Sequence, residues 1–191
     1  YGTNGFYLDF SNSGTKHTIT ANGNTNHSTA QSKIGATGIY FDGTDDYLTV
    51  PDSDDWDWAG DFTIETWFRA DVLGSSSYHY LFDTNTTGDY FSITFNASNK
   101  IGWYYNGGPP TIESSSTFSA TTWYHLALVK NGSTTTLYVD GASEGTYSDS
   151  NTYSIDKLWI GAPNEAGYRT TGFMDEIRIS NTARYTSTFT P

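Results

Sequence analysis

Cysteine is absent from this chain of 191 residues, so a disulfide framework, a thiolate zinc site and a cysteine nucleophile are all excluded. The sequence also lacks any run of about 18 apolar residues, which a membrane-spanning helix would need, and any basic-then-apolar signal peptide. We therefore expect no insertion into a membrane. Because the chain starts at Tyr1 and not at methionine, we expect it to be a piece of a longer protein whose targeting signal has been removed.

Positive charge is scarce: nine Lys and Arg residues stand against 21 Asp and Glu residues, which gives a net charge of −12. Such a chain repels the phosphate backbone of nucleic acids and the surface of anionic membranes, so neither is an expected partner. Most of the acids are aspartates. In a Gly- and Asn-rich loop, aspartate offers the hard oxygen ligands that calcium prefers, although most short acids in loops simply suit turns.

Aromatic residues, in contrast, are abundant: 15 Tyr, 11 Phe and 6 Trp make up 17% of the chain, whereas charged residues make up 16%. A polar but weakly charged surface is what we expect of a module that works outside the cell. The length is sufficient for one substantial core, and no stretch resembles a linker long enough to separate two. We therefore predict a single domain over residues 1–191.

A three-strand meander is indicated by the turn residues in the second half of the chain. Two runs rich in Leu, Val, Tyr and Thr, at 123–130 and 134–139, are separated by Asn-Gly at 131–132, and Asp-Gly follows at 140–141. These dipeptides favour the positive φ angles of two-residue hairpin turns. The pattern predicts antiparallel strands whose register the turns fix.

Short segments of the same kind recur along the chain between turn signals. The turn at 42–46 carries three carboxylates and, with the apolar runs on either side, predicts a hairpin. No segment has a convincing helical period. We predict an all-β fold, a two-sheet antiparallel β-sandwich of the jelly-roll type. Besides the meander, strands are expected at 5–10, 39–41, 47–50, 62–69, 80–82, 90–95, 100–105, 157–160 and 173–179, with one weak strand near 17–20.

Five of the six tryptophans fall into two groups. Trp67, Trp123 and Trp159 lie among aliphatic residues in predicted strands, and we assign them to the core. Trp56 and Trp58 alternate with aspartates and stay unassigned.

Six motifs occur in order along the chain: FDGTDDYL at 41–48, DFTIETW at 61–67, WYHLALV at 123–129, LYVDG at 137–141, GFMDEIRI at 172–179 and ARYT at 183–186. This ordered set resembles the laminin-G-like family of concanavalin A-type jelly rolls. The resemblance covers roughly residues 36–191, and its tail is similar to the tails of such domains in bacterial surface proteins and phage structural proteins. It implies two antiparallel sheets of about six or seven strands, in a family whose members bind carbohydrates or proteins, often with calcium, and sometimes cleave glycans.

The carboxylates do not suit glycoside hydrolysis, which needs two of them about 5 Å apart for retaining chemistry. Glu65 is a lone acid on its strand, and Asp175 and Glu176 are adjacent, so they point to opposite faces. A Tyr and His pair for lyase chemistry could come from residues 78–80 and His125, although such residues in strands more often serve packing. We expect no catalytic activity, with polysaccharide lyase or glycosidase as the less favoured alternative.

The resemblance implies two possible calcium sites. In the first, Asp175 meets Asp9 and the carbonyl group of Gly43, so that the ion ties the chain ends together. The alternative is that Asp175 accepts a hydrogen bond or pairs with Arg178 or Arg184.

In the second possible site, the loops 83–89 and 161–168 lie side by side at one rim, as in pentraxin-like relatives. Asp89, Asn164 and Glu165 then occupy the ligand positions. This sequence lacks the fuller set of acids that those relatives carry in the second loop, which argues for weak binding or a lost site.

Aromatic clusters provide the remaining signal for binding, because Trp and Tyr offer a flat ring to the apolar face of a sugar and a polar tip to its hydroxyl groups. The candidates are Trp103, Tyr104, Tyr105, Tyr80 and Asn106. Strand alternation places two members of the 103–105 run on one face and the third on the other. Because one face is core, at most half of these rings can contact a ligand.

We therefore expect a non-catalytic, lectin-like module that binds a glycan or polysaccharide, with calcium as a structural or ligand-bridging ion, on a cell surface or virion. The alternative is a structural or adhesive domain of a phage appendage or adhesin that contacts neighbouring protein domains. An aromatic-lined groove favours the first hypothesis, and a contiguous apolar patch favours the second.

Overall fold

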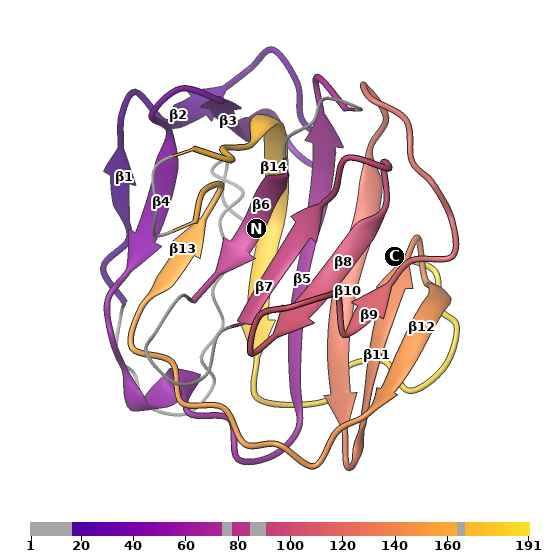
Figure 1. Ribbon diagram of the computed structural model, residues 1–191. Helices are drawn as coiled ribbons and strands as arrows, with labels where there is room; N and C mark the ends of the chain where they lie inside the picture. Colours follow the sequence, from indigo (N-terminus) through magenta and orange to yellow (C-terminus); the bar gives the residue numbers. More distant parts are fainter. Residues whose placement is uncertain (1–16, 74–77, 85–90, 164–166) are drawn as a thin grey trace.

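The computed structural model describes residues 17–73, 78–84, 91–163 and 167–191, which form two stacked antiparallel β-sheets (Figure 1). The all-β, two-sheet sandwich predicted from the sequence is confirmed. The predicted strand at 5–10 lies outside the described residues. The elements are β1 (Thr20–Asn22), β2 (Asn26–Ser28), β3 (Gly38–Asp42), β4 (Tyr47–Val50), the 3₁₀ turn η1 (Asp54–Trp56), β5 (Phe62–Ala70), β6 (His79–Asp83), β7 (Phe91–Phe95), β8 (Ile101–Tyr105), β9 (Ile112–Glu113), β10 (Tyr124–Asn131), β11 (Thr134–Val139), β12 (Ala142–Ser148), β13 (Leu158–Ile160) and β14 (Thr171–Ser180).

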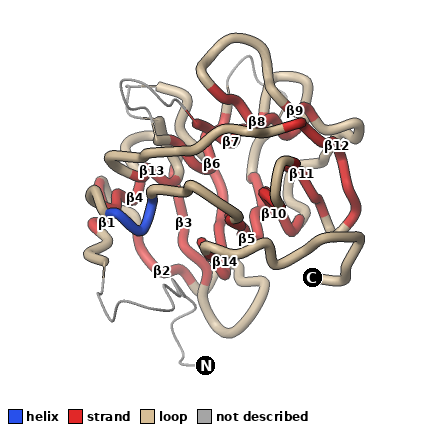
Figure 2. Tube along the Cα trace, turned by 90° about the horizontal axis from the view of Figure 1, so that it is seen from below, coloured by secondary structure: helices blue, strands red, loops and turns tan. Residues whose placement is uncertain are grey.

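Each sheet has seven strands. The first, called sheet A, has the order β1-β4-β13-β6-β7-β8-β9, and the second, sheet B, has the order β12-β11-β10-β5-β14-β3-β2. Figure 2 shows the two layers from below, with β6, β7 and β8 in one and β3, β14 and β5 in the other. In the part of the chain that is described, no helix has the length and apolar character to cross a membrane.

The core lies between the sheets because alternate side chains of each strand point inward. In β5, Phe62, Ile64 and Phe68 are fully buried among inward residues of the neighbouring strands, whereas Glu65 and Trp67 lie on the outer face. The side chains of this strand therefore alternate between the core and the outer face. Burial of these rings and branched side chains is the main term that stabilises the sandwich.

The burial of the tryptophans differs from the prediction made from the sequence. Trp56 and Trp58, which were unassigned, are buried at 1% and 3% exposure, and Trp58 stacks on Phe62 with ring centroids 4.5 Å apart. Trp67 and Trp159, which were assigned to the core, lie outside it and are each covered by a lysine, Lys33 at 4.0 Å and Lys157 at 4.4 Å from the ring centroids.

Trp123, the third tryptophan assigned to the core, is only partly buried and immediately precedes β10. The assignment of Trp67, Trp123 and Trp159 to the core was therefore wrong. For the two that lie within strands, the reason is alternation: residues on both sides of Trp67 and Trp159 point inward, so the tryptophans point outward.

The predicted meander is confirmed as β10, β11 and β12. Val139 pairs with Ala142 across a turn in which Asp140 and Gly141 have φ angles of 48° and 78°. At the first turn, only Gly132 has a positive φ angle, 57°. Asparagine at 131 is instead the last paired residue of its strand.

The predicted hairpin across the turn at 42–46 is wrong. Strand β3 pairs with β14 and β2 in sheet B, whereas β4 pairs with β1 and β13 in sheet A. The turn is instead a crossover between sheets, closed by the backbone N–H of Asp42, which donates to the carboxylate of Asp46 at 2.9 Å.

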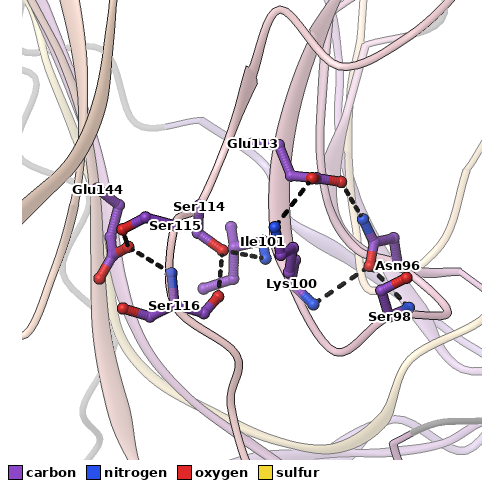
Figure 3. Close-up of polar contacts among 9 residues, drawn as sticks. All are labelled: Asn96, Ser98, Lys100, Ile101, Glu113, Ser114, Ser115, Ser116 and Glu144. Atoms are coloured by element: carbon purple, nitrogen blue, oxygen red, sulfur yellow. Dashed lines mark hydrogen bonds and ion pairs between the residues drawn. The ribbon is translucent and has the colours of Figure 1, made fainter.

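Polar contacts close one corner of the sandwich, where β12 of sheet B approaches β9 of sheet A (Figure 3). The carboxylate of Glu144 on β12 accepts hydrogen bonds from the hydroxyl of Ser115 and the backbone N–H of Ser116, at 2.7 and 2.9 Å. Close approach at this corner needs a glycine: a Cβ atom on Gly145 would lie 2.7 Å from Cγ2 of Ile112. These contacts cover part of the edge strand β12.

The C-terminal tail, residues 181–191, crosses the outer face of sheet B (Figure 2). Its anchor is the buried carboxylate of Glu65, which accepts a hydrogen bond from the hydroxyl of Tyr185 at 2.7 Å and lies 2.7 Å from Nε of Arg184. The rings of Tyr185 and Phe189 stack at 3.5 Å and pack on the apolar outer residues of β10 and β11. The tail thereby buries the outer face of these strands.

Burial raises the pKa of Glu65, but hydrogen bonds from His125 and Tyr185 and the charge of Arg184 outweigh it, so the pKa lies below the ordinary value. A lowered folded-state pKa stabilises the fold above the unfolded-state pKa, and this contribution is lost as the pH falls through the folded-state pKa. We expect Glu65→Gln to lower the melting temperature at pH 7 and the difference from the wild type to shrink toward pH 3, as measured by thermal melts.

Glu176→Gln is the matched control. Burial first and the neighbouring Asp175 second raise the pKa of Glu176, so its charge does not stabilise the fold at pH 7 and its removal should not lower the melting temperature. If Glu65→Gln shows the same difference from the wild type at pH 7 and pH 3, the assigned role of Glu65 is wrong.

Candidate functional site

A pocket of about 420 Å³ opens on the outer face of sheet A. Its described lining consists of Tyr78, Tyr80, Thr94, Tyr104, Asn106, Gly107 and Gly108. Three of these residues present phenol rings, and the others present neutral polar groups or backbone.

Strand register brings the pocket residues together. Tyr80 pairs with Thr94, and Thr94 pairs with Gly102, so the three lie side by side across β6, β7 and β8. Tyr104 is two residues beyond Gly102 and therefore lies on the same outer face.

Gly102 makes room for the ring of Tyr104 on the sheet. A Cβ atom on Gly102 would lie 2.7 Å from Cε2 of Tyr104 and 3.2 Å from its hydroxyl oxygen. The ring thus lies back over the glycine and not away from the sheet. Any larger residue at 102 would move the ring.

The turn after β8 forms another wall of the pocket. Asn106, Gly107 and Gly108 all have positive φ angles, 58°, 73° and 82°, a run that glycine adopts without steric cost. No atom lies within 4 Å of where a Cβ of either glycine would be, so backbone conformation and not space requires glycine here. With no side chains, Gly107 and Gly108 present backbone polar groups to the pocket.

Four tyrosines form a cluster at the pocket, which we call the tyrosine cluster: Tyr78, Tyr80, Tyr104 and Tyr168. Tyr78 meets Tyr104 and Tyr168 edge-on, at centroid distances of 6.3 and 6.1 Å, and the backbone N–H of Tyr80 donates to the carbonyl of Tyr168 at 3.5 Å. Tyr78 and Tyr168 are 37% and 52% exposed, so their rings are accessible to a ligand. The sequence analysis missed Tyr168, because no local pattern links it to a strand 90 residues earlier.

The hydroxyl group of Tyr104 is a neutral group over a wide pH range. Burial, reinforced by Tyr78, raises the pKa of Tyr104 to about 12. The phenol therefore stays protonated at physiological pH and can both donate and accept a hydrogen bond.

The structure places the five predicted ligand-binding residues in two groups. Tyr80, Tyr104 and Asn106 line the pocket. Trp103 has 0% exposure within the core and Tyr105 packs against the core, so both point away from the pocket and we withdraw them from the site. Alternation along β8 explains the split, because Tyr104 lies on the face opposite to both.

The first predicted calcium site is contradicted by the register of β14 and β3. Thr171 pairs with Asp42 and Met174 pairs with Ile39, so Asp175 and Gly43 lie roughly 13 Å apart along the strands and cannot share an ion. The carboxylate of Asp175 accepts hydrogen bonds from the backbone N–H groups of Lys33 and Ile34 at 2.8 and 3.0 Å. Asp175 thus accepts hydrogen bonds, as in the alternative to calcium binding that the sequence left open. The remaining predicted ligand, Asp9, lies outside the described residues.

The second predicted site depended on two loops at one rim. Strands β6 and β13 are antiparallel neighbours, with Asp83 opposite Trp159. The loop that follows β6 therefore begins at one end of this strand pair, and the loop that follows β13 begins at the other end. The predicted arrangement does not hold for those ends. The proposed ligands themselves, Asp89, Asn164 and Glu165, lie outside the described residues.

One group of carboxylates in the described part of the chain could hold a cation. Asp42, Asp45 and Asp46 in the crossover turn have oxygen atoms within 4.8 Å of one another. Asp46 is fully buried, and its two oxygens accept backbone N–H groups of Asn24 and Asp42 at 2.8 and 2.9 Å. A set of carboxylate oxygens suits calcium.

A second hollow, of about 330 Å³, lies near β1 and β2. Its lining is mainly aliphatic, with Ile19, Ile39 and Leu48, and includes no Tyr, Trp or Phe among the residues described. The imidazole of His27 is the one ring in its described lining, so the pocket with three tyrosines is the better candidate site for a sugar.

The fold and the site together define a class: a lectin-like sandwich with an aromatic pocket on an outer sheet face. The chain belongs to the concanavalin A-like lectin/glucanases superfamily, whose laminin G family model matches residues 42–187. The resemblance seen in the sequence is thereby confirmed. This fold is shared by non-catalytic binding domains and by glycosidases. A comparison with curated protein sequences finds no match.

Solved structures with the same fold come from different proteins. Domain 4 of AbnA, an extracellular arabinanase from Geobacillus stearothermophilus solved in complex with arabinotriose, is 18% identical over 85% of this chain and 81% of that chain, with a TM-score of 0.63. The receptor-binding domain of botulinum neurotoxin D is 11% identical over 90% of this chain and 46% of that chain, with a TM-score of 0.67. Trypanosoma rangeli sialidase in complex with 2,3-difluorosialic acid is 16% identical over 84% of this chain and 28% of that chain, with a TM-score of 0.61.

The chain thus spans less than half the length of the neurotoxin and sialidase chains. At these identities the likeness shows the fold alone.

The close contact between Gly102 and Tyr104 yields a test of the site's geometry. We expect Gly102→Ala to turn the Tyr104 ring away from the sheet and increase its exposure, because the added methyl group would overlap the ring edge. A crystal structure of the variant, or a shift of the Tyr104 ring signals in NMR spectra, measures this. Gly60→Ala, where nothing lies within 4 Å of the added methyl group, is the control and should leave the ring unchanged. An unmoved ring in Gly102→Ala would show that the sheet itself yields.

Proposed function

We propose that this domain is a non-catalytic carbohydrate-binding module that holds a sugar in the tyrosine-lined pocket. The observation that carries the proposal is the pocket itself: about 420 Å³, lined by Tyr78, Tyr80 and Tyr104 together with Thr94 and the turn at 106–108. Rings that face a sugar and hydroxyl and backbone groups that bind its hydroxyls are the usual composition of such a site.

The nature of the described lining supports binding without catalysis. Glycoside hydrolysis needs a pair of carboxylates beside the bond that breaks. No carboxylate belongs to the described pocket lining. Glu65 lies on the other sheet beneath the C-terminal tail, where its carboxylate pairs with Arg184 and accepts a hydrogen bond from Tyr185.

Structural neighbours and the exposed apolar residues support a glycan over a protein partner. Domain 4 of AbnA is described with arabinotriose, and botulinum neurotoxin type C is described as entering cells through two ganglioside molecules. The large exposed hydrophobic residues in the described ranges are Ile34, Val72, Tyr78 and Tyr168, and two of the four belong to the tyrosine cluster. A module of this kind works outside the cell, on a cell surface or virion, where polysaccharides occur.

Replacement of the exposed rings tests the pocket. We expect Tyr78→Ser and Tyr168→Ser each to weaken glycan binding by roughly three- to tenfold, because an aromatic contact contributes about 0.5–1.5 kcal/mol. Affinity electrophoresis in a panel of cell-wall and algal polysaccharides, followed by calorimetry on the best ligand, measures the change.

Ile34→Ser is the matched control for those two variants. Ile34 is 50% exposed, and its backbone is held by Asp175 of sheet B, away from the pocket. Its replacement should leave binding unchanged. Retention of no polysaccharide by the unmodified domain, with or without calcium, would refute the proposal.

We further propose that calcium stabilises the domain at Asp42, Asp45 and Asp46. Three carboxylates this close repel one another, and a cation bound between them would remove that repulsion. The charges of Asp42 and Asp46, after burial and Asp71, contribute to raising the pKa of the nearby Tyr40 hydroxyl, which reflects the negative field at this turn.

Chelation tests the calcium proposal. We expect EDTA to lower the melting temperature by several degrees, since an ion bound only to the native state stabilises it by mass action. Asp45→Asn should remove this effect, whereas Asp57→Asn, at an exposed acid outside the group, should preserve it. An unchanged melting curve would remove calcium, and an EDTA effect that persists in Asp45→Asn would place the ion elsewhere.

A further inference from the structure

The charges around the pocket bear on the class of glycan that the domain selects. An anionic sugar, such as a sialic acid or a uronate, loses hydration when it enters a pocket, and this loss is offset only if a cation or several N–H donors pair with its carboxylate. The position of every lysine and arginine is therefore informative.

No basic side chain belongs to the described lining of the pocket. The three internal segments outside the described residues, 74–77, 85–90 and 164–166, contain no lysine or arginine in their sequence. Of the nine basic residues in the chain, Lys16 lies in the undescribed N-terminal segment and the other eight are described.

Each of the eight described basic residues contacts a partner elsewhere. Five form ion pairs with carboxylates, and three lie over aromatic rings. The contacts are Lys33 over Trp67, Arg69 with Asp71, Lys100 with Glu113, Lys130 with Asp149, Lys157 over Trp159, Arg169 over Tyr47, and Arg178 and Arg184 with Glu65.

The ammonium of Lys157 lies over Trp159, which is opposite Asp83 at the end of β6 away from Tyr80. Two further cations come near the pocket strands and need separate treatment. Lys100 directly precedes β8, but its Nζ lies 3.2 Å from the carboxylate of Glu113. Arg169 follows Tyr168 in sequence, but its guanidinium group lies 5.0 Å from the ring of Tyr47 on β4, which is separated from β6 by β13. Both charges are therefore compensated or directed away from the pocket.

Glu113 adds a negative charge beside the pocket, which Lys100 partly offsets. Glu113 pairs across the sheet with Gly102, and its charge is one of the causes that raise the pKa of Tyr104. The whole chain carries a net charge of −12. A second negative charge in the pocket would meet repulsion, and no cationic side chain belongs to the described lining to offset its loss of hydration.

We infer that the pocket selects neutral glycans and rejects sialylated, uronate-containing or sulfated ones. The inference rests on the proposed function and narrows it to a class of sugar. Several polar groups of the pocket can form hydrogen bonds with sugar hydroxyl groups. They are the phenol hydroxyls of Tyr78, Tyr80 and Tyr104, the amide of Asn106 and the backbone at 107–108.

Matched pairs of glycans test this inference on the full chain. A glycan array carries galactose-terminated oligosaccharides beside the same structures with a terminal sialic acid, and neutral hexose oligomers beside uronate oligomers of equal length. We expect at least about tenfold stronger binding of the neutral member of the bound pair, because an unpaired charge in the pocket costs at least 1.4 kcal/mol. Binding should change little between 50 and 500 mM sodium chloride, since no ion pair forms.

The outcomes separate the two proposals. If neither member of any pair binds, carbohydrate binding itself fails. If the acidic member binds as well as or better than the neutral one, or if salt weakens binding strongly, the neutral-glycan inference is overturned while carbohydrate binding stands. In that case Arg169→Gln identifies whether Arg169 supplies the cation, and Lys157→Gln, whose ammonium lies over Trp159, serves as the control.

Discussion

A strand in a two-sheet sandwich can present only one of its faces to solvent, and this constraint places the aromatic rings of the described strands. Strand β8 shows the consequence most directly. Trp103 is fully buried and packs among the rings of Phe91 and Tyr153, while Tyr104, one residue further, lies on the outer face and lines the pocket. The same alternation that builds the core thus decides which ring a ligand can reach.

The two outer faces differ in what covers them. On sheet B, the C-terminal tail lies over β10 and β11, held by the carboxylate of Glu65, and the backbone of residues 33 and 34 is held by Asp175. On sheet A, the face formed by β6, β7 and β8 carries the pocket. Buried carboxylates on sheet B therefore hold covering segments in place, and sheet A keeps a hollow with neutral walls.

Local patterns in the sequence were sufficient for most of the described strands and for the meander, because turn residues and alternation act over a few positions. The short strands β2 and β9 were not predicted. Asp140 and Gly141 have the φ angles that their identities favour. The hairpin at 42–46 failed because the same turn residues also suit a crossover, and only pairing with β14 and β13 distinguishes the two. Tyr168 could not be placed beside Tyr80 without knowledge of the fold, and neither could the separation of Asp175 from Gly43.

The cover over the outer tryptophans and the neutral lining of the pocket both follow from where the few cations of the chain lie. Large rings on an outer face need cover, and a lysine or arginine can supply it with its long apolar stem and its charge over the ring. Lys33 covers Trp67, Lys157 covers Trp159 and Arg169 covers Tyr47. With only nine basic residues in the chain, those engaged in covering rings and in pairing with buried acids are not at the tyrosine cluster, whose rings pack instead on one another. The stability of the outer faces and the neutrality of the pocket are therefore two results of one distribution of charge.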